Sequence, residues 1–198
     1  MANTIELFVP AAEPYAEPGT MAVRPGSLVG LRLGVLDNGK EFSDVVLEAL
    51  AEVLKRDFAV AETQFWRKGY PAKAAPFIRE MAASCDVVIS GVGHCGSSTP
   101  WSVHDSVALE KNGIPTVTLI SRSFCALGQT VARGLGYEGL PIIELPHPIG
   151  DPDRDRIRRK GIDAVMESVR LLTTPAPQVI NEFKDKHFSL PEHVVARA

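Results

Sequence analysis

The feature that most constrains the fold is a regular alternation of short β-branched runs with amphipathic helical segments. Strands are predicted at residues 31–36, 58–65, 86–89, 115–120 and 140–145. Helices are predicted at residues 43–56, 76–84, 100–113 and 123–135, and a last long helix follows Asp153 with Ile157, Ile162, Val165 and Val169 facing inward. This order predicts an α/β protein with a five-stranded parallel, doubly wound sheet of the flavodoxin-like type, helices on both faces and the strand order 2-1-3-4-5.

Proline-rich segments flank this alternating region. Residues 1–26 contain four prolines and predict an extended arm whose apolar side chains pack on the domain or on a neighbouring subunit. Residues 27–174 form the predicted catalytic domain, and residues 175–198 form a second, C-terminal arm. Two arms on a small domain favour a homo-oligomer.

Composition excludes several classes of protein. Of 198 residues, 45% are hydrophobic and 23% are charged, which is typical of a globular domain, and the net charge of -3 gives no general attraction to nucleic acid. No window approaches the roughly 18 apolar residues of a membrane span, and the acidic N-terminus is unlike a signal peptide, so we expect a cytoplasmic protein without membrane partners. Three cysteines without CxxC or Cys/His spacing predict neither a structural disulfide nor a metal site.

In the predicted sheet, ligands bind where the strand order reverses, beyond the carboxyl ends of strands 1 and 3. Polar and reactive residues gather there. Asn38 and Lys40 follow strand 1 and Cys95 follows strand 3. Strand 4 ends near Arg122 and Cys125, and strand 5 ends at His147, which reaches Cys95 only if its loop leans inward.

Cys95 is the predicted nucleophile. It follows a buried strand in a glycine-rich turn, and Thr99 as N-cap with Pro100 after it predicts the start of a helix. Free backbone N–H groups and the helix dipole stabilise a thiolate at such a position. Cys85 ends an apolar helix face and is predicted to be an inert buried residue.

Three separated motifs carry a family resemblance: LDNGK at 36–40, GHCGSSTPWSVHDSVALEKNGIPTV at 93–117 and LPHP at 145–148. Together they resemble the UGSC family of (seleno)proteins, which is similar in motif to the selenoprotein subunits of glycine and proline reductases. The likeness covers roughly residues 28–150. Cys95 occupies the selenocysteine/cysteine position, Gly96 and Ser97 follow as in the motif, and Ser98 stands where the motif has its second cysteine. The resemblance implies redox or covalent sulfur chemistry, and the missing second thiol argues against a local disulfide cycle.

Other residues receive supporting roles. We predict His104 as the proton acceptor for Cys95, with Asp105 beside it, because a histidine within reach of a thiol is its usual base. His94 is the less favoured base, since adjacent side chains in extended chain point apart. The predicted substrate-binding residues are Asn38, Lys40, Gly96, Ser97, Ser98, Thr99 and Trp101, in which the lysine and the amide suit a carboxylate or an oxyanion and Trp101 forms an apolar wall.

These residues predict a cysteine-dependent enzyme that cleaves a small carboxylate- or carbonyl-containing molecule through a covalent Cys95 intermediate, as a lyase or hydrolase without a cofactor. A thiol-dependent reductase is one alternative, reset by an external thiol or by Cys125. The other is a redox-sensing module, or one that binds NADP or flavin, because Gly91-x-Gly93-x-x-Gly96 follows a strand and Arg122 lies near the end of the next.

Overall fold

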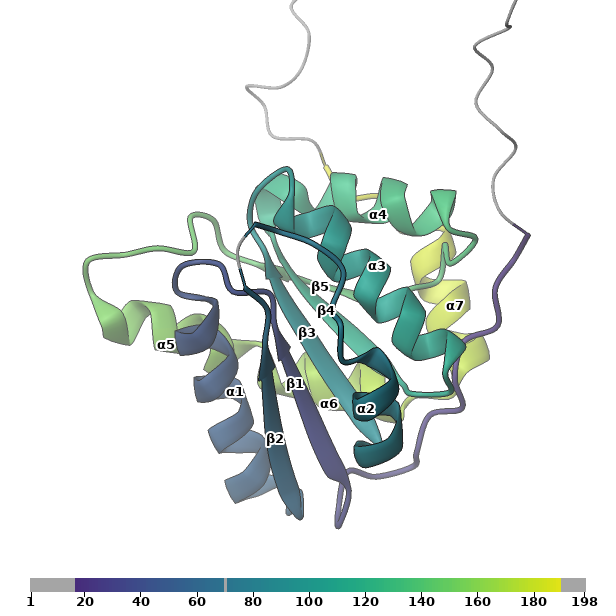
Figure 1. Cartoon of the computed structure of the whole chain (residues 1–198), viewed down its shortest axis with the longest axis horizontal. Helices are drawn as coiled ribbons and strands as arrows, with labels where there is room; N and C mark the ends of the chain where they lie inside the picture. The colour runs from purple at the N-terminus through teal and green to yellow at the C-terminus, as the bar shows by residue number, and fades with distance from the viewer. Residues whose placement is uncertain (1–16, 70, 190–198) are drawn as a thin grey trace, which may run out of the picture.

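A computed structural model describes residues 17–69 and 71–189 of the chain. It contains one five-stranded, all-parallel sheet in the order β2-β1-β3-β4-β5, which confirms the predicted fold class and strand order (Figure 1). The strands are β1 (Arg32–Asp37), β2 (Glu62–Arg67), β3 (Val87–Gly93), β4 (Thr116–Ser121) and β5 (Ile142–Leu145). The helices are α1 (Ser43–Asp57), α2 (Ile78–Ser84), α3 (Ser98–Lys111), the short 3-10 helix η1 (Arg122–Phe124), α4 (Cys125–Gly134), α5 (Arg154–Asp163), α6 (Val165–Thr173) and α7 (Ala176–Lys184).

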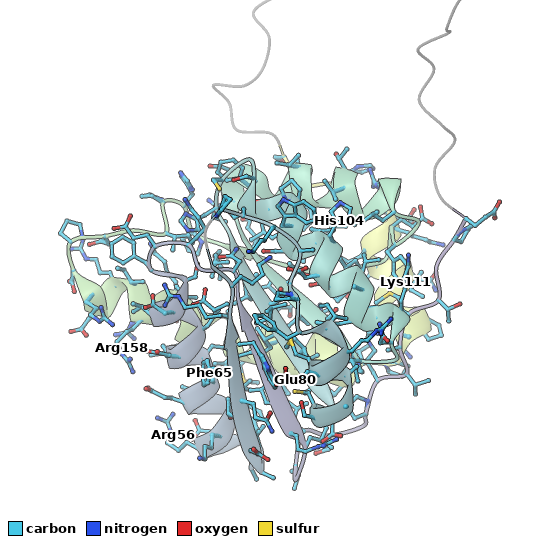
Figure 2. All side chains as sticks on the ribbon, viewed as in Figure 1. Arg56, Phe65, Glu80, His104, Lys111 and Arg158 are labelled. Atoms are coloured by element: carbon cyan, nitrogen blue, oxygen red, sulfur yellow. The ribbon has the colours of Figure 1, made fainter. Side chains whose placement is uncertain are left out.

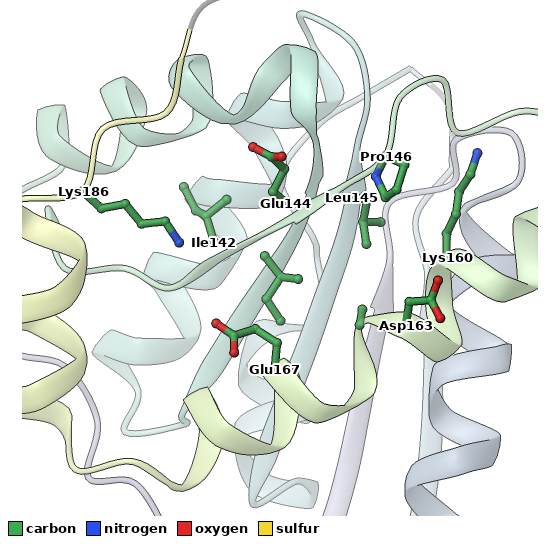
Figure 3. A pocket seen from close by; sticks show the side chains of 10 residues that line it. Ile142, Glu144, Leu145, Pro146, Lys160, Asp163, Glu167 and Lys186 are labelled. Carbon is green, nitrogen blue, oxygen red and sulfur yellow. The ribbon is translucent and has the colours of Figure 1, made fainter.

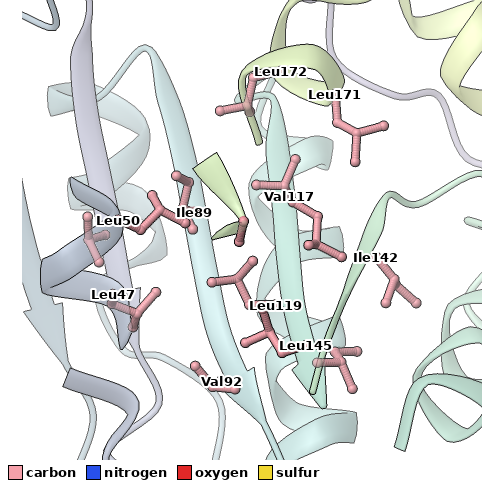
Figure 4. Close-up of a cluster of buried hydrophobic side chains, with 14 of the residues drawn as sticks. Leu47, Leu50, Ile89, Val92, Val117, Leu119, Ile142, Leu145, Leu171 and Leu172 are labelled. Atoms are coloured by element: carbon pink, nitrogen blue, oxygen red, sulfur yellow. The ribbon is translucent and has the colours of Figure 1, made fainter. Parts of the chain in front are cut away.

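Helices cover both faces of the sheet. α1, α5 and α6 pack together on one face, and α2, α3 and α4 lie on the other (Figure 1). β3 and β4 are buried along their whole length, as the apolar runs of central parallel strands require. The larger core joins these strands to the α1 and α6 face, where Leu50 and Leu171 meet Ile89 and Val117 (Figure 4).

The second strand begins later than predicted. Its predicted range was 58–65, but β2 runs from Glu62 to Arg67. The backbone N–H of Phe58 still bonds to Leu54 and closes α1, and Ala59 takes a positive φ of 51° in the turn that follows. The chain therefore needs residues 58–61 to reverse direction before it can join the sheet.

The predicted last long helix is two helices, because the chain makes a tight turn at Ala164, whose N–H bonds to Gly161. Gly161 lies directly on α1: a Cβ there would stand 2.1 Å from the Val46 carbonyl oxygen. After the turn Val165 is buried, whereas Ile162, predicted to face inward, is 40% exposed.

The C-terminal segment also differs from an extended arm over part of its length. Pro175 and Pro177 sit at the start of α7, where proline is compatible with helix geometry. Val179 and Phe183 on this helix are buried in the core. Residues 190–198 of the predicted C-terminal arm lie outside the described residues, as do residues 1–16 of the N-terminal arm; residues 17–26 contain neither helix nor strand.

Candidate active site

Cys95 lies in the turn that joins the carboxyl end of β3 to α3, as predicted. β3 ends at Gly93 and α3 begins at Ser98. Gly93 lets the first turn of α3 come close to the strand, since a Cβ on it would stand 2.9 Å from the Thr99 hydroxyl oxygen. The sulfur of Cys95 is thereby placed at the N-terminal end of the helix, half-buried.

Three hydrogen bonds converge on the Cys95 sulfur. The backbone N–H of Ser98 donates to Sγ at 3.2 Å, and the hydroxyl oxygens of Ser98 and Ser97 lie 3.0 and 3.4 Å from it. Burial acts to raise the pKa of Cys95, but the side-chain and backbone hydrogen bonds from Ser97 and Ser98 outweigh it and lower the pKa to about 7. A large share of Cys95 is therefore thiolate near neutral pH.

Ser98, at the place of the second motif cysteine, links two parts of this turn. Its hydroxyl oxygen accepts a hydrogen bond from the backbone N–H of His94 at 3.3 Å while it lies against the Cys95 sulfur. Since the oxygen already accepts from His94, its own hydrogen is free to point at a thiolate. The side chain is 1% exposed, so it acts on the sulfur from the protein side.

The helix start differs from the predicted one. The N-cap is Ser97, without a side-chain capping bond, and Pro100 lies two residues inside the helix rather than at its first position. Thr99, predicted as the N-cap, is fully buried and its hydroxyl oxygen has no hydrogen-bond partner among the described residues. The Cys95 sulfur accepts the N–H of Ser98, one of the backbone donors of the first helical turn that have no partner within the helix.

His94 lies near Lys40 and His147. Burial, the nearby charge of Lys40 and, to a smaller degree, that of His147 lower the pKa of His94 to about 4, against an opposing contribution from the Glu41 backbone. Its Nε2 is buried and has no hydrogen-bond partner among the described residues. His94 is therefore neutral at physiological pH.

The loop after β5 brings His147 to the end of β4. The Nδ1 atom of His147 lies 3.2 Å from the hydroxyl oxygen of Ser121, the last residue of β4. The ring also packs edge-on against Phe124, with 6.1 Å between the ring centroids. These contacts hold His147, whose side chain is exposed, at the carboxyl edge of the sheet.

Asn38 and Lys40 end up in different roles. Asn38 is 5% exposed, and its amide nitrogen donates to the Val92 carbonyl at 2.7 Å and to the Ser102 hydroxyl at 3.0 Å. Its amide oxygen accepts from the backbone N–H of Lys40 and from the hydroxyl of Ser43. Asn38 thus ties the loop after β1 to β3 and α3, and Lys40 is the member of the pair that keeps a partly exposed side chain. Ser43 is the first residue of α1, and its hydroxyl donates to the Asn38 side-chain oxygen.

The structure does not join His104 to Cys95. His104 is exposed on the outer face of α3, where its ring lies 5.3 Å from the Trp101 ring (Figure 2). Among residues 17–69 and 71–189, no hydrogen bond connects His104 with Cys95. The spacing from Cys95 to His104 places the histidine two helical turns along α3, away from the turn that holds the sulfur.

Asp105 forms a buried ion pair that the sequence did not reveal. Its carboxylate accepts from Lys68 Nζ at 2.5 Å and from the Ala75 backbone N–H at 2.8 Å. Burial raises the pKa of Asp105, with the Lys68 ammonium acting against the shift. Lys68 also donates to the Lys73 carbonyl at 2.7 Å, so this pair fastens the loop after β2 onto α3. Lys68 follows β2 much as Lys40 follows β1, and no local signal marks its partner, which lies 37 residues away.

The remaining cysteines are buried, and Arg122 forms an ion pair on the surface. Cys85 is 2% exposed, and burial raises its pKa, as expected of an inert thiol. Cys125 is fully buried at the start of α4 and donates to the Ile120 and Ser121 carbonyls. Burial raises the pKa of Cys125 to about 12. Arg122 is exposed and pairs with Glu144 at 2.7 Å.

The glycine pattern is not a dinucleotide-binding turn. Gly91 and Gly93 lie within β3, whereas that fingerprint needs its first glycines in the turn that follows a strand. Among residues 17–69 and 71–189, no group of three or more His, Cys, Asp or Glu side chains could hold a metal ion, and no helix is both long and apolar enough to cross a membrane.

A separate cavity of about 180 Å³ lies along the outer edge of β5 (Figure 3). Its lining includes Glu144, Lys160, Asp163, Glu167 and Lys186 and contains none of the predicted site residues. The part of the structure that brings predicted residues together is therefore the turn around Cys95, with Lys40, His94 and His147 at the same edge of the sheet.

Comparison with known proteins identifies the family of the chain. No curated protein shows significant similarity to the chain. The sequence model of the UGSC family matches residues 6–174, which include the whole sheet and all the site residues described above. The chain therefore belongs to the UGSC family.

Proposed function

We propose that this UGSC protein is a cysteine-dependent enzyme that uses the Cys95 thiolate as a nucleophile. The observation that carries the proposal is the set of hydrogen bonds from Ser97 and Ser98 to the Cys95 sulfur, with a pKa of about 7. Structural cysteines do not need such an environment, and Cys85 and Cys125 in the same chain have raised pKa values. Activation of the sulfur is assigned to Ser97 and Ser98, and His104 takes no part in it.

The substrate class is a small carboxylate- or carbonyl-containing molecule. Lys40 supports this choice: its charge is near enough to affect His94, and it makes no salt bridge with any described residue. A free lysine beside a nucleophile suits a substrate carboxylate. Asn38 and Thr99 are buried and build the site, whereas Gly96, Ser97 and Trp101 keep exposed or partly exposed surface toward which a substrate can approach.

The chemistry that fits is covalent cleavage. The thiolate attacks an electrophilic carbon, an S–C bond forms, and the leaving group departs with the electron pair of the bond that breaks. Water then adds to the carbon and releases the thiolate. No second thiol is consumed in this cycle, which agrees with Ser98 standing 3.0 Å from the sulfur and with Cys125 buried in the core.

A thiol-dependent reductase is the second candidate, because Cys95 occupies the redox position of the family motif. In this chain the cycle would use an external thiol, since both other cysteines, Cys85 and Cys125, are buried. Turnover that requires added thiol would favour this candidate, and turnover without it favours cleavage.

The first test is the pH profile of alkylation by iodoacetamide, followed by mass spectrometry of each cysteine. Only the thiolate reacts, so Cys95 should react half-maximally near pH 7 and faster above it, while Cys85 and Cys125 stay unmodified in the folded protein. Cys95→Ala should remove both this reaction and turnover without loss of stability. A Cys95 profile centred near the ordinary value of about 8.5, or a fully active Cys95→Ala variant, would contradict the proposal.

A further inference from the structure

β2 is an edge strand of the sheet. Among residues 17–69 and 71–189 it pairs with β1 only, so within this part of the chain the backbone groups on its outer side have no strand neighbour. Each of its residues is exposed or half-buried, unlike those of the buried central strands. An uncovered strand edge with apolar side chains is a template for pairing with another chain. The opposite edge, β5, differs because the C-terminal segment and α6 line its cavity.

The surface beside this edge combines an aromatic side chain with a hollow. Phe65 is 51% exposed and lies on the side of β2 that faces α1 (Figure 2). Next to it is a cavity of about 250 Å³ between β2 and α1, lined by Glu48, Ala51, Glu52, Lys55, Thr63 and Phe65 itself. A cavity of about 150 Å³ already accommodates benzene, so this hollow has room for a phenylalanine ring. The same surface therefore carries both a protruding ring and a space for one.

The charges on α1 are arranged so that they complement themselves. Along the helix Glu48 comes before Lys55, and both line the cavity. Neither forms a salt bridge with any described residue. A two-fold axis perpendicular to the sheet reverses the direction of the helix in the second copy, so Glu48 of each copy faces Lys55 of the other.

We infer that a second copy of this chain docks on this surface, with the two β2 strands antiparallel and the two sheets joined into one. Antiparallel neighbours share a face of the sheet, so a register that sets Gln64 opposite its own copy places Thr63 opposite Phe65 of the second copy. Thr63 and Phe65 both line the cavity. The Phe65 rings then fill the two hollows, and the two Glu48 to Lys55 pairs close the interface on either side. The inference does not depend on the chemistry proposed for Cys95.

The test is sedimentation equilibrium over a range of protein concentrations. The wild-type protein should dimerise. Glu48→Lys and Lys55→Glu should each raise the dimer dissociation constant at least tenfold, because each sets two like-charged pairs opposite one another. The double variant, Glu48→Lys with Lys55→Glu, restores two opposite-charge pairs and should return the dissociation constant to near the wild-type value.

Replacing one of two exposed apolar residues with lysine, inside or outside the proposed interface, provides the control. Phe65→Lys should abolish the dimer, whereas Met166→Lys, at a residue 68% exposed on α6, should leave it intact. Circular dichroism checks that each variant is folded. A wild-type protein that stays monomeric at the highest concentration overturns the inference. So does a dimer that survives Phe65→Lys, or charge effects that the double variant does not reverse.

Discussion

Ser98 contacts the Cys95 sulfur through two groups. Its hydroxyl and its backbone N–H both reach the Cys95 sulfur, and its oxygen is held in place by the His94 N–H. A second cysteine at this position would offer a resolving thiol. A serine offers a hydrogen bond to the thiolate instead, which stabilises the charged form without forming a covalent bond.

We predict that Ser98→Ala raises the pKa of Cys95, because the thiolate loses the hydrogen bond from the Ser98 hydroxyl. A rise of about one pKa unit would slow alkylation at pH 7 roughly fivefold. Rates of iodoacetamide labelling between pH 5 and 9 measure the effect. His104→Ala is the control and should leave the profile unchanged, since His104 makes no hydrogen bond with Cys95 among the described residues. A shift in the control and none in Ser98→Ala would return activation of the thiol to His104.

At the level of elements, the C-terminal end of α3 anchors the segment that precedes β1. The carboxylate of Glu110 accepts hydrogen bonds from the Ala22 N–H and from two nitrogens of Arg24. It also accepts from the N–H and hydroxyl of Thr116 at the start of β4. Both side chains of the Arg24 to Glu110 ion pair are fully buried. α3 therefore carries the reactive turn at one end and fixes the N-terminal segment at the other.

Removing one member of this pair should destabilise the fold strongly. Arg24→Leu leaves the Glu110 carboxylate buried without its counter-ion, a change that typically costs about 3 to 5 kcal/mol. Arg32→Leu is the matched control, because the Arg32 to Asp86 pair is largely exposed at 42% and 35% and such pairs contribute about 1 kcal/mol or less. The free energy of unfolding in urea measures both. Equal losses in the two variants would contradict the anchoring role of Arg24.

For the whole molecule, both ends of the described chain meet near α4. The N–H of Gly19 bonds to the Gly136 carbonyl just beyond α4. From the other end, Gln129 on α4 donates to the Lys186 carbonyl, and Arg133 donates to the Lys184 carbonyl at 3.3 Å. α7 is thus packed into the domain rather than lying beside it.

Substitution of Phe183 tests whether α7 is part of the folded core. It is 1% exposed and belongs to the main core, so Phe183→Ala should lower the free energy of unfolding by about 3 to 5 kcal/mol through lost burial and the cavity left behind. Asn181→Ala on the exposed side of the same helix should change it by less than about 0.5 kcal/mol. Thermal and urea unfolding provide the measurement. A Phe183→Ala variant as stable as the wild type would mean that α7 is a detachable arm.

The sequence alone determined the order of elements, the parallel sheet and the place of Cys95 between β3 and α3. These features depend on signals carried by neighbouring residues: hydrophobic period, helix-starting residues and glycine-rich turns. It also predicted the edge of the sheet at which Lys40, Cys95 and His147 gather, because strand order fixes which loops meet there.

Only the tertiary structure decided which side chains around this edge of the sheet contact one another. It placed Asp105 against Lys68, Asn38 against Ser102 and His147 against Ser121, pairs that lie 37, 64 and 26 residues apart in the chain. Such contacts depend on loop conformation and on how each helix is rotated about its axis. A hydrophobic pattern constrains that rotation too loosely to say that His104 points away from Cys95 while Ser98 points toward it.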